Sequence, residues 1–165
     1  MLSEKLKQLL NEQMNYEFES AYLYLAMATD AATKGLNGAA NWLTVQYEEE
    51  LIHSFKIKDY LLQNGCTPKF SGVTFKHVDY KDLHQILSTS LAAEKKVTAL
   101  INNIMKEAYA EGNFAVISFI NWYIDEQIEE EANVNDLIER LSLYTDANII
   151  LFDNELAKRK LNQEG

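Results

Sequence analysis

The sequence contains few residues that interrupt a helix. Of its 165 residues, one is proline and six are glycine, whereas an average protein has about 5% proline and 7% glycine. Inside a helix, proline removes a backbone donor, and glycine costs about 1 kcal/mol relative to alanine. The scarcity of both residues therefore predicts long helices, with the few glycines lying between them.

Cysteine and long apolar runs are also scarce. Because Cys66 is the only cysteine, the chain can form neither an internal disulfide nor a metal site built from several thiolates. The first ten residues, MLSEKLKQLL, lack the apolar core of a secretory signal. The longest uncharged stretches, such as residues 112–124, are too short to span a bilayer. We therefore expect a soluble, cytoplasmic protein.

Positive charge is in the minority, with 15 Lys and Arg against 25 Asp and Glu and a formal net charge of −10. An acidic surface of this kind repels nucleic acids and anionic membranes and attracts cations. We expect neither nucleic acid nor membrane as a partner. The length and the 47% of hydrophobic residues suit a single domain over residues 1–165 with a packed core.

Glycine and proline divide the chain into helical segments. The dividing residues are Gly35, Gly38, Gly65, Pro68, Gly72 and Gly112. They predict four long helices over about residues 4–141 and a short fifth helix over about 145–161. The residues that precede three of the helices are predicted N-caps, namely Ser3, Asn37 and Asp82.

The four long segments share a spacing that alternates between three and four residues, which is typical of the seam of a helical bundle. The four stripes run from Leu10 to Ala31, from Leu43 to Tyr60, from Leu83 to Ala108 and from Val116 to Leu141. Each stripe is mainly apolar and is interrupted near its middle by Glu, His or Gln. The sequence therefore predicts an all-α four-helix bundle.

The segment at residues 65–81 decides the topology. Its roughly seventeen residues, at about 3.3 Å each, can cross the length of a helix of about 27 residues, which is near 40 Å. The other two connections between long helices are short, as antiparallel neighbours require. We therefore expect the second and third helices to be parallel and joined by one long crossover.

The polar residues that interrupt the stripes lie at about the same depth in the predicted bundle. They are Glu17, Glu50, His53, Glu94, Gln127 and Glu130. A lone buried carboxylate costs several kcal/mol unless it is paired or binds a metal. No Lys or Arg lies on the stripes, and a shared proton can relieve one pair of carboxylates but hardly all four. Metal cations are the predicted partners.

The kinds of ligand narrow the choice of metal. Glu50 and His53 lie three residues apart on one helix and reach one site from the same face, and Gln127 and Glu130 repeat this spacing. A set rich in oxygen, with one imidazole and no sulfur, disfavours structural zinc and suits iron or manganese. Glu50, and also Glu94, are candidates to bridge two metals.

Further candidates surround this layer. Glu49, Glu126 and Glu129 are offset by one residue from the inward positions, so we expect them on the flank of the bundle, where the alternative is an ordinary solvated face. Tyr24 follows Glu17 by one heptad and is close enough to hydrogen-bond a ligand or donate an electron; the alternative is that it only packs.

At these residues the chain resembles the ferritins, specifically the prokaryotic non-haem type, over essentially its whole length. The resemblance implies a ferritin-like bundle that binds one iron at Glu17, Glu50 and His53 and a second at Glu50, Glu94 and Glu130. It places Gln127 and Tyr24 beside this centre. It also implies a third iron site, formed by Glu49, Glu126, Glu129 and Glu130.

The resemblance further implies a function. Ferritins oxidise Fe(II) with O2 or H2O2, assemble into hollow shells of twenty-four subunits and store Fe(III) as mineral inside them. The chain departs from two relatives of this family. Di-iron oxidases and bacterioferritins carry Glu-x-x-His on two helices, whereas this chain has Gln127-x-x-Glu130 on the fourth. Bacterioferritins place a haem-binding methionine where this chain has Leu51, so we expect no haem.

Two other functions compete with iron storage by a ferroxidase. One is a di-iron oxidase that acts on an organic or peroxide substrate, which predicts a monomer or dimer with a cavity beside the metals. The other is a metal-free interaction bundle. Isolated candidates have simpler explanations, since His77 and His84 are expected at the surface and Cys66 in a loop.

Overall fold

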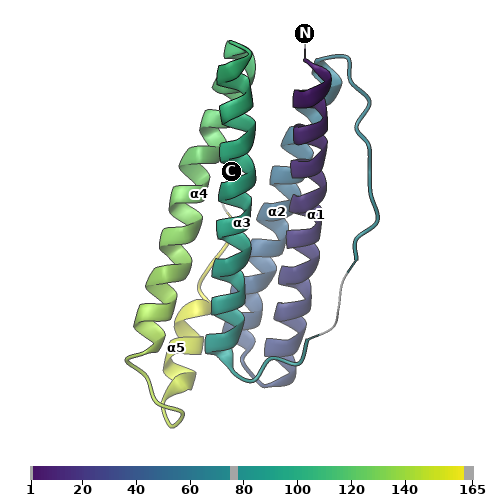
Figure 1. Cartoon of the computed structure of the whole chain (residues 1–165). Helices are drawn as coiled ribbons and strands as arrows, with labels where there is room; N and C mark the ends of the chain where they lie inside the picture. The colour runs from purple at the N-terminus through teal and green to yellow at the C-terminus, as the bar shows by residue number, and fades with distance from the viewer. Residues whose placement is uncertain (1, 75–77, 162–165) are drawn as a thin grey trace.

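The computed structural model describes residues 2–74 and 78–161. These residues form five helices and no strand, in a long bundle with a short helix at one end (Figure 1). The helices are α1 (Glu4–Thr33), α2 (Asn37–Gln63), α3 (Leu83–Ala110), α4 (Phe114–Leu141) and α5 (Ile149–Leu156). The predicted all-α bundle with a short fifth helix is confirmed.

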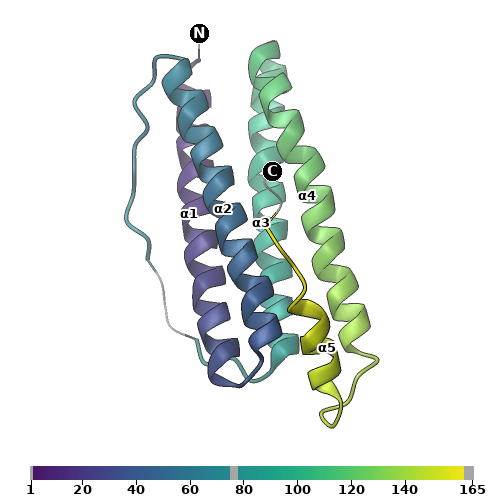
Figure 2. The same ribbon diagram turned by 180° about the vertical axis from the view of Figure 1, so that it is seen from behind.

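The helices form two antiparallel pairs. Helix α1 packs against α2, α3 packs against α4, and α1 joins the pairs through its contact with α3. The connection from α2 to α3 runs along the outside of α1 from one end of the bundle to the other (Figures 1 and 2). As predicted, α2 and α3 are therefore parallel.

Asparagine side chains of α1 hold part of this crossover. Asn11 Oδ1 accepts from the backbone N of Lys69 at 2.6 Å, and Asn15 Oδ1 accepts from the backbone N of Ser71 at 2.8 Å. Asn15 Nδ2 also donates to the carbonyl O of Lys69 at 2.7 Å. These bonds satisfy backbone groups that have no ladder or helix to join.

The core consists of two hydrophobic clusters with polar residues between them. One cluster includes Leu10, Met14 and Ile101, and the other includes Met27 and Leu87. All the residues of the four predicted stripes are buried except Tyr60, which is half-buried. The buried polar residues of the stripes therefore lie in a layer across the middle of the bundle.

Two of the predicted N-caps are present. The Ser3 hydroxyl accepts from the backbone N of Leu6 at 3.0 Å, and Asp82 Oδ1 accepts from the backbone N of Gln85 at 2.8 Å. Each bond satisfies one of the amide groups that the first turn of a helix leaves without a partner.

The third predicted N-cap, Asn37, is wrong. Asn37 is the first residue of α2, and the capping position is Leu36, whose side chain makes no cap. Asp153 of α5 supplies the missing acceptors, because its carboxylate binds the backbone N of Gly38 at 2.9 Å and of Ala39 at 2.7 Å. A contact between segments so distant in sequence has no local pattern from which to predict it.

Helix α5 is shorter than the predicted segment 145–161. It begins only at Ile149, because the Asn148 side chain accepts from the backbone N of Thr145 at 2.6 Å and so forms a local turn that competes with helix. Helix α5 packs closely on α2. A Cβ atom at Gly38 would lie 1.7 Å from the carbonyl O of Asp153, so only glycine fits there.

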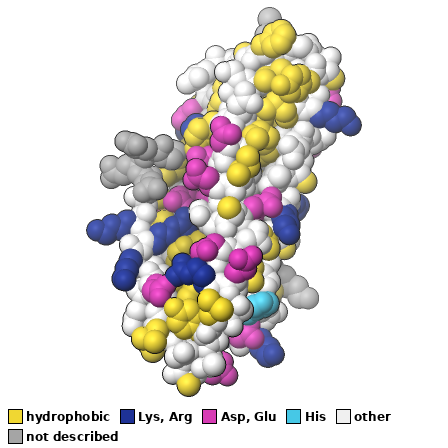
Figure 3. Space-filling model, turned by 90° about the vertical axis from the view of Figure 1, so that its left-hand side faces the viewer, with side chains coloured by type: hydrophobic (Ala, Val, Ile, Leu, Met, Phe, Trp, Pro, Cys, Tyr) yellow, Lys and Arg dark blue, Asp and Glu magenta, His cyan; other side chains and the backbone are white. Residues whose placement is uncertain are grey.

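Hydrophobic side chains remain exposed near both ends of the molecule. On the face in Figure 3 they gather towards the ends, while charged side chains of both signs lie between. The exposed residues include Tyr109 and Phe114 at the turn between α3 and α4, and Leu143, Ile150 and Leu151 beyond α4. Within the described residues, none of the helices combines the length and apolar character that a membrane span needs.

Candidate metal centre

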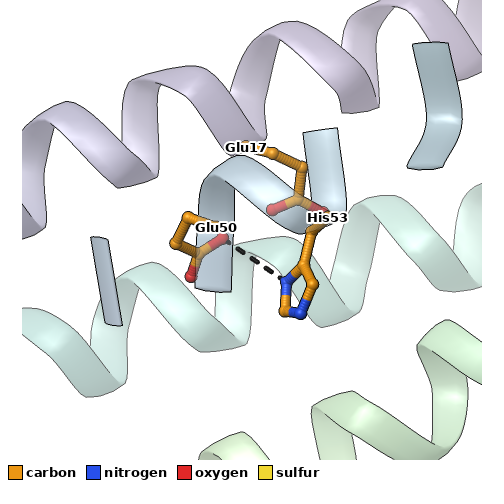
Figure 4. A group of neighbouring side chains, drawn as sticks. All are labelled: Glu17, Glu50 and His53. Carbon is orange, nitrogen blue, oxygen red and sulfur yellow. Dashed lines mark ion pairs between the residues drawn. The ribbon is translucent and has the colours of Figure 1, made fainter. Parts of the chain in front are cut away.

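Three predicted ligands converge from α1 and α2. Glu17, Glu50 and His53 each offer a ligand atom within 4.8 Å of the others, and all three side chains are buried (Figure 4). Glu50 and His53 share one face of α2, with 3.7 Å between Glu50 Oε2 and His53 Nδ1. Glu17 reaches the same point from α1. This half of the predicted set has the geometry of a metal site.

The other half of the layer comes from α3 and α4. Glu94, Gln127 and Glu130 are buried, and Gln127 Nε2 donates to Glu94 Oε2 at 3.1 Å. Glu130 Oε2 accepts from Gln46 Nε2 of α2 at 3.0 Å. The negative charges of Glu94 and Glu130 both raise the pKa of Glu50, so the two halves face a common space.

Burial makes the ionised form of these carboxyl groups costly. It is the main reason why the pKa values of Glu17 and Glu50 lie well above the ordinary 4.5. Burial, with the charges of Glu94 and Glu49, raises the pKa of Glu130 to about 7. For Glu94, burial raises the pKa, although hydrogen bonds from Tyr24 and Gln127 oppose it.

In the described part of the chain, two carboxyl oxygens of the layer are left without hydrogen bonds, as is the amide oxygen of the adjacent Gln46. Glu17 Oε2 and Glu50 Oε2 are buried and have no hydrogen-bond partner among the described residues. Buried polar atoms in native proteins nearly always have a partner. Two bare carboxylate oxygens beside the His53 imidazole are the donors that a divalent or trivalent iron ion would use. The residues present therefore fit bound iron.

Comparisons with known proteins agree with this geometry. The family model described as a ferritin-like domain matches residues 7–144. The chain belongs to the ferritin family. It is 35% identical to the bacterial non-heme ferritin of Staphylococcus aureus (strain MRSA252) over 166 residues, which cover 99% of this chain and 100% of that protein. The bacterial non-heme ferritin of Staphylococcus haemolyticus (strain JCSC1435) is 35% identical with the same coverage.

Solved ferritin structures have the same fold. The open-pore ferritin of the hyperthermophilic archaeon Archaeoglobus fulgidus superposes with a TM-score of 0.93 at 35% identity, covering 96% of this chain and 98% of that one. A humanized archaeal ferritin gives a TM-score of 0.95 at 34% identity, covering 98% and 99%. Membership of the ferritin family supports a role in iron storage.

In this member of the ferritin family, Tyr24 contacts the polar layer directly. The side chain is fully buried, and its hydroxyl donates a short hydrogen bond to Glu94 Oε1. Burial raises the pKa of Tyr24 well above its ordinary value, so the phenol stays protonated. The expected hydrogen bond from Tyr24 to a candidate ligand is present, and its role as an electron donor stays a prediction.

Some residues that position the candidate ligands were not predicted. Gln13 Nε2 donates to Glu17 Oε1 at 2.7 Å, and the Tyr123 hydroxyl donates to the carbonyl O of His53 at 2.7 Å. Gln13 precedes Glu17 by four residues, so the helical spacing could have identified it. Tyr123 lies on the predicted fourth stripe, but a stripe does not reveal which backbone atom a phenol reaches.

The three glutamates predicted on the flank of the bundle are only partly buried. Glu49 and Glu126 are half-buried and Glu129 is exposed. Burial raises the pKa of Glu49, as does the charge of Glu126, while Arg159 lowers it. Arg159 was not predicted, because it lies outside the four stripes; its Nη2 lies 2.5 Å from Glu49 Oε2.

Two isolated candidates, His84 and Cys66, lie away from the layer. His84 is exposed, as expected, and Cys66 is half-buried just beyond α2. His77 lies outside the described residues.

Proposed function

We propose that the chain is an iron-storing ferritin subunit and a ferroxidase, which oxidises Fe(II) in the buried polar layer of its bundle. The observation that carries this proposal is the pair of bare, buried oxygens on Glu17 and Glu50 beside His53. An arrangement built only for stability would satisfy those oxygens with hydrogen bonds or replace the carboxylates with apolar groups.

Iron is the substrate of this centre. We assign one Fe(II) to Glu17, Glu50 and His53 and a second to Glu50, Glu94 and Glu130. Gln127 lies beside them and donates to Glu94 Oε2 at 3.1 Å. Carboxylates suit the hard Fe(III) product, and their variable binding modes allow it to leave. The raised pKa values mean that iron must displace protons from the carboxyl groups as it binds.

Either O2 or H2O2 can accept the electrons from Fe(II). Two Fe(II) ions give two electrons to O2, which takes up two protons to form H2O2. With H2O2 as the acceptor, two Fe(II) ions again give two electrons, the O–O bond breaks, and uptake of two protons gives two water molecules. The Fe(III) product then moves on and hydrolyses to a mineral. Leu51, at the position of the haem-binding methionine of bacterioferritins, supports a site without haem.

Storage requires a closed container, so we further propose a shell of twenty-four copies of this chain. Each subunit would be a single ferritin-like domain over residues 1–165. The exposed Ile150 and Leu151 of α5 are candidate contacts between subunits. A third iron would bind at Glu49, Glu126, Glu129 and Glu130. We retain the cytoplasm as the predicted location, because Cys66 has no intramolecular partner for a disulfide.

Aerobic addition of Fe(II) to the metal-free protein, followed by size exclusion with iron analysis, tests storage. We expect a shell-sized particle that carries many more irons than three per chain. A small species with about two irons per chain would instead support a di-iron oxidase. A protein that retains no iron would leave only a metal-free interaction bundle.

Replacing one ligand tests the centre itself. The variant His53→Ala should lose rapid Fe(II) oxidation, because the imidazole is the only nitrogen donor of the three converging side chains, while shell assembly stays intact. His84→Ala is the matched control, since His84 is exposed on α3, and it should oxidise Fe(II) at the unaltered rate. Fast oxidation by His53→Ala would show that the assignment is wrong.

A further inference from the structure

The segment that follows α5 turns back along the bundle. After Leu156 it runs between α2 and α4 towards the middle of the molecule (Figure 2). The Asn41 side chain of α2 fixes its backbone, because Asn41 Nδ2 donates to the carbonyl O of Arg159 at 3.0 Å and approaches that of Ala157 at 3.4 Å. The segment thereby brings a basic side chain to the flank of the metal centre.

The Arg159 side chain lies against α2. Its Nη2 is 2.5 Å from Glu49 Oε2, and its guanidinium lies 4.4 Å from the centre of the Trp42 ring. Only 19% of the side chain is exposed. Nη1 is buried and has no hydrogen-bond partner among the described residues. A guanidinium that is held on one side and unsatisfied on the other is an incomplete fit for a purely structural ion pair.

The charge of Arg159 acts on two of the carboxyl groups assigned to the third iron. Glu49 and Glu130 both respond to it, since the positive charge of Arg159 lowers the pKa of each. Glu126 lies near enough to Glu49 to raise its pKa. The guanidinium thus contacts Glu49 and acts on Glu130, which are two of the four residues to which we assign the third iron.

We infer that Arg159 takes the place of a cation at the third iron site, so that a metal ion can bind Glu49 only after it displaces the guanidinium. This inference rests on the proposed function, because it takes Glu49, Glu126, Glu129 and Glu130 as a metal site. Arg159 of the C-terminal segment then competes with the metal for Glu49, so the third site binds metal more weakly than its four carboxylates alone would.

The chain offers a sharp optical test, because it has two tryptophans and only Trp42 stacks on Arg159. Trp122 lies against His53 and would report on the inner sites. In a Trp122→Phe background, Trp42 is the sole fluorophore of its kind. Zn(II) is the probe, since it is redox-inert and does not quench emission by itself. Equilibrium dialysis of the assembled, metal-free protein gives the stoichiometry in parallel.

We expect Arg159→Gln to raise the affinity for the third Zn(II) about tenfold or more and to leave the first two unchanged. Trp42 emission should change as the third Zn(II) binds to the Arg159 protein, and this change should be absent in Arg159→Gln. Lys158→Gln is the matched control, because it removes the same charge from an exposed neighbour, and its third affinity should stay within about twofold of the parent.

Other results would overturn the inference. If the third Zn(II) binds equally well, or more weakly, in Arg159→Gln, Arg159 is only a structural anchor. If two Zn(II) bind but no third does in any variant, there is no site for Arg159 to occupy, although the inner centre of the proposed function stands. If the first two Zn(II) ions also fail to bind, the inner centre is refuted as well. If Arg159→Gln fails to assemble, Arg159→Lys replaces it in the test, because lysine keeps the charge but lacks the planar guanidinium. We expect Arg159→Lys to bind the third Zn(II) more tightly than the parent. Equal or weaker binding would contradict displacement of the guanidinium.

Discussion

Replacing Glu130 with glutamine should change how the stability of the metal-free protein depends on pH. The pKa of Glu130 is raised from 4.5 to about 7, mainly by burial. Between these values the folded protein holds a proton that the unfolded chain has released. Because the folded state then binds more protons than the unfolded state, the free energy of unfolding falls as pH rises through this window.

The size of the effect follows from the shift of about 2.5 pKa units, at 1.36 kcal/mol per unit. Glu130 therefore lowers the stability of the metal-free protein by about 3 kcal/mol at pH 8, and by less than about 1 kcal/mol at pH 5. Glutamine has nearly the same shape and can still accept the hydrogen bond from Gln46, which Glu130 accepts at 3.0 Å. Glu130→Gln should thus be more stable than the parent by about those amounts.

Urea unfolding followed by circular dichroism, at one subunit concentration and at both pH values, measures this difference. Glu129→Gln is the control, since Glu129 is the exposed neighbour on α4, and it should change stability by no more than about 0.5 kcal/mol at either pH. If the free energies of unfolding of Glu130→Gln and the parent differ by the same amount at pH 5 and pH 8, Glu130 is ionised in the folded protein throughout. Its pKa would then not be raised by burial.

Two further substitutions test contacts that hold the bundle together. Tyr24→Phe removes the donor to Glu94 Oε1 and should cost about 1–3 kcal/mol in urea unfolding; an unaltered midpoint would mean that the bond contributes nothing. Gly38→Ala places a Cβ 1.7 Å from the carbonyl O of Asp153 and should displace α5, with a loss of at least about 2 kcal/mol. Asp153→Asn, which keeps an acceptor for one of the two amides, should lose less; if Gly38→Ala were as stable as the parent, α5 would not be held in this way.

The bundle and its polar layer could be predicted because both depend on local periodicity. An alternation of three and four residues fixes which side chains face inward, so Glu17, Glu50, Glu94 and Glu130 were expected in the core, where the structure has them. Their common depth followed from counting residues between the turns. The length of the crossover determined that α2 and α3 are parallel, again from chain geometry alone.

The contacts that the sequence did not reveal are those made across the chain. Asp153 caps α2 from 115 residues away, and Arg159 reaches Glu49 from 110 residues away. Neither lies on a periodic stripe, so no spacing rule connects it with its partner. The start of α5 was misplaced for a different, local reason, because the Asn148 turn decides it and helical propensity does not.

The arrangement of the helices in two hairpins has a consequence for how the protein folds. Helices α1 and α2 supply Glu17, Glu50 and His53, while α3 and α4 supply the rest of the layer. Each hairpin consists of contacts close in sequence and can form early, whereas their docking needs long-range contacts. The carboxylates of the first hairpin therefore meet those of the second in the last step, and the repulsion between the two sets opposes it.

If iron binds at the proposed centre, that step is where pH and iron would act on folding. At high pH the two hairpins approach with like charges and should dock slowly; at lower pH, protons bound by the layer remove the repulsion. An iron ion held by the first hairpin would attract the second. Bound iron would then assist the folding of the subunit, and newly made subunits would complete their cores faster when iron is plentiful.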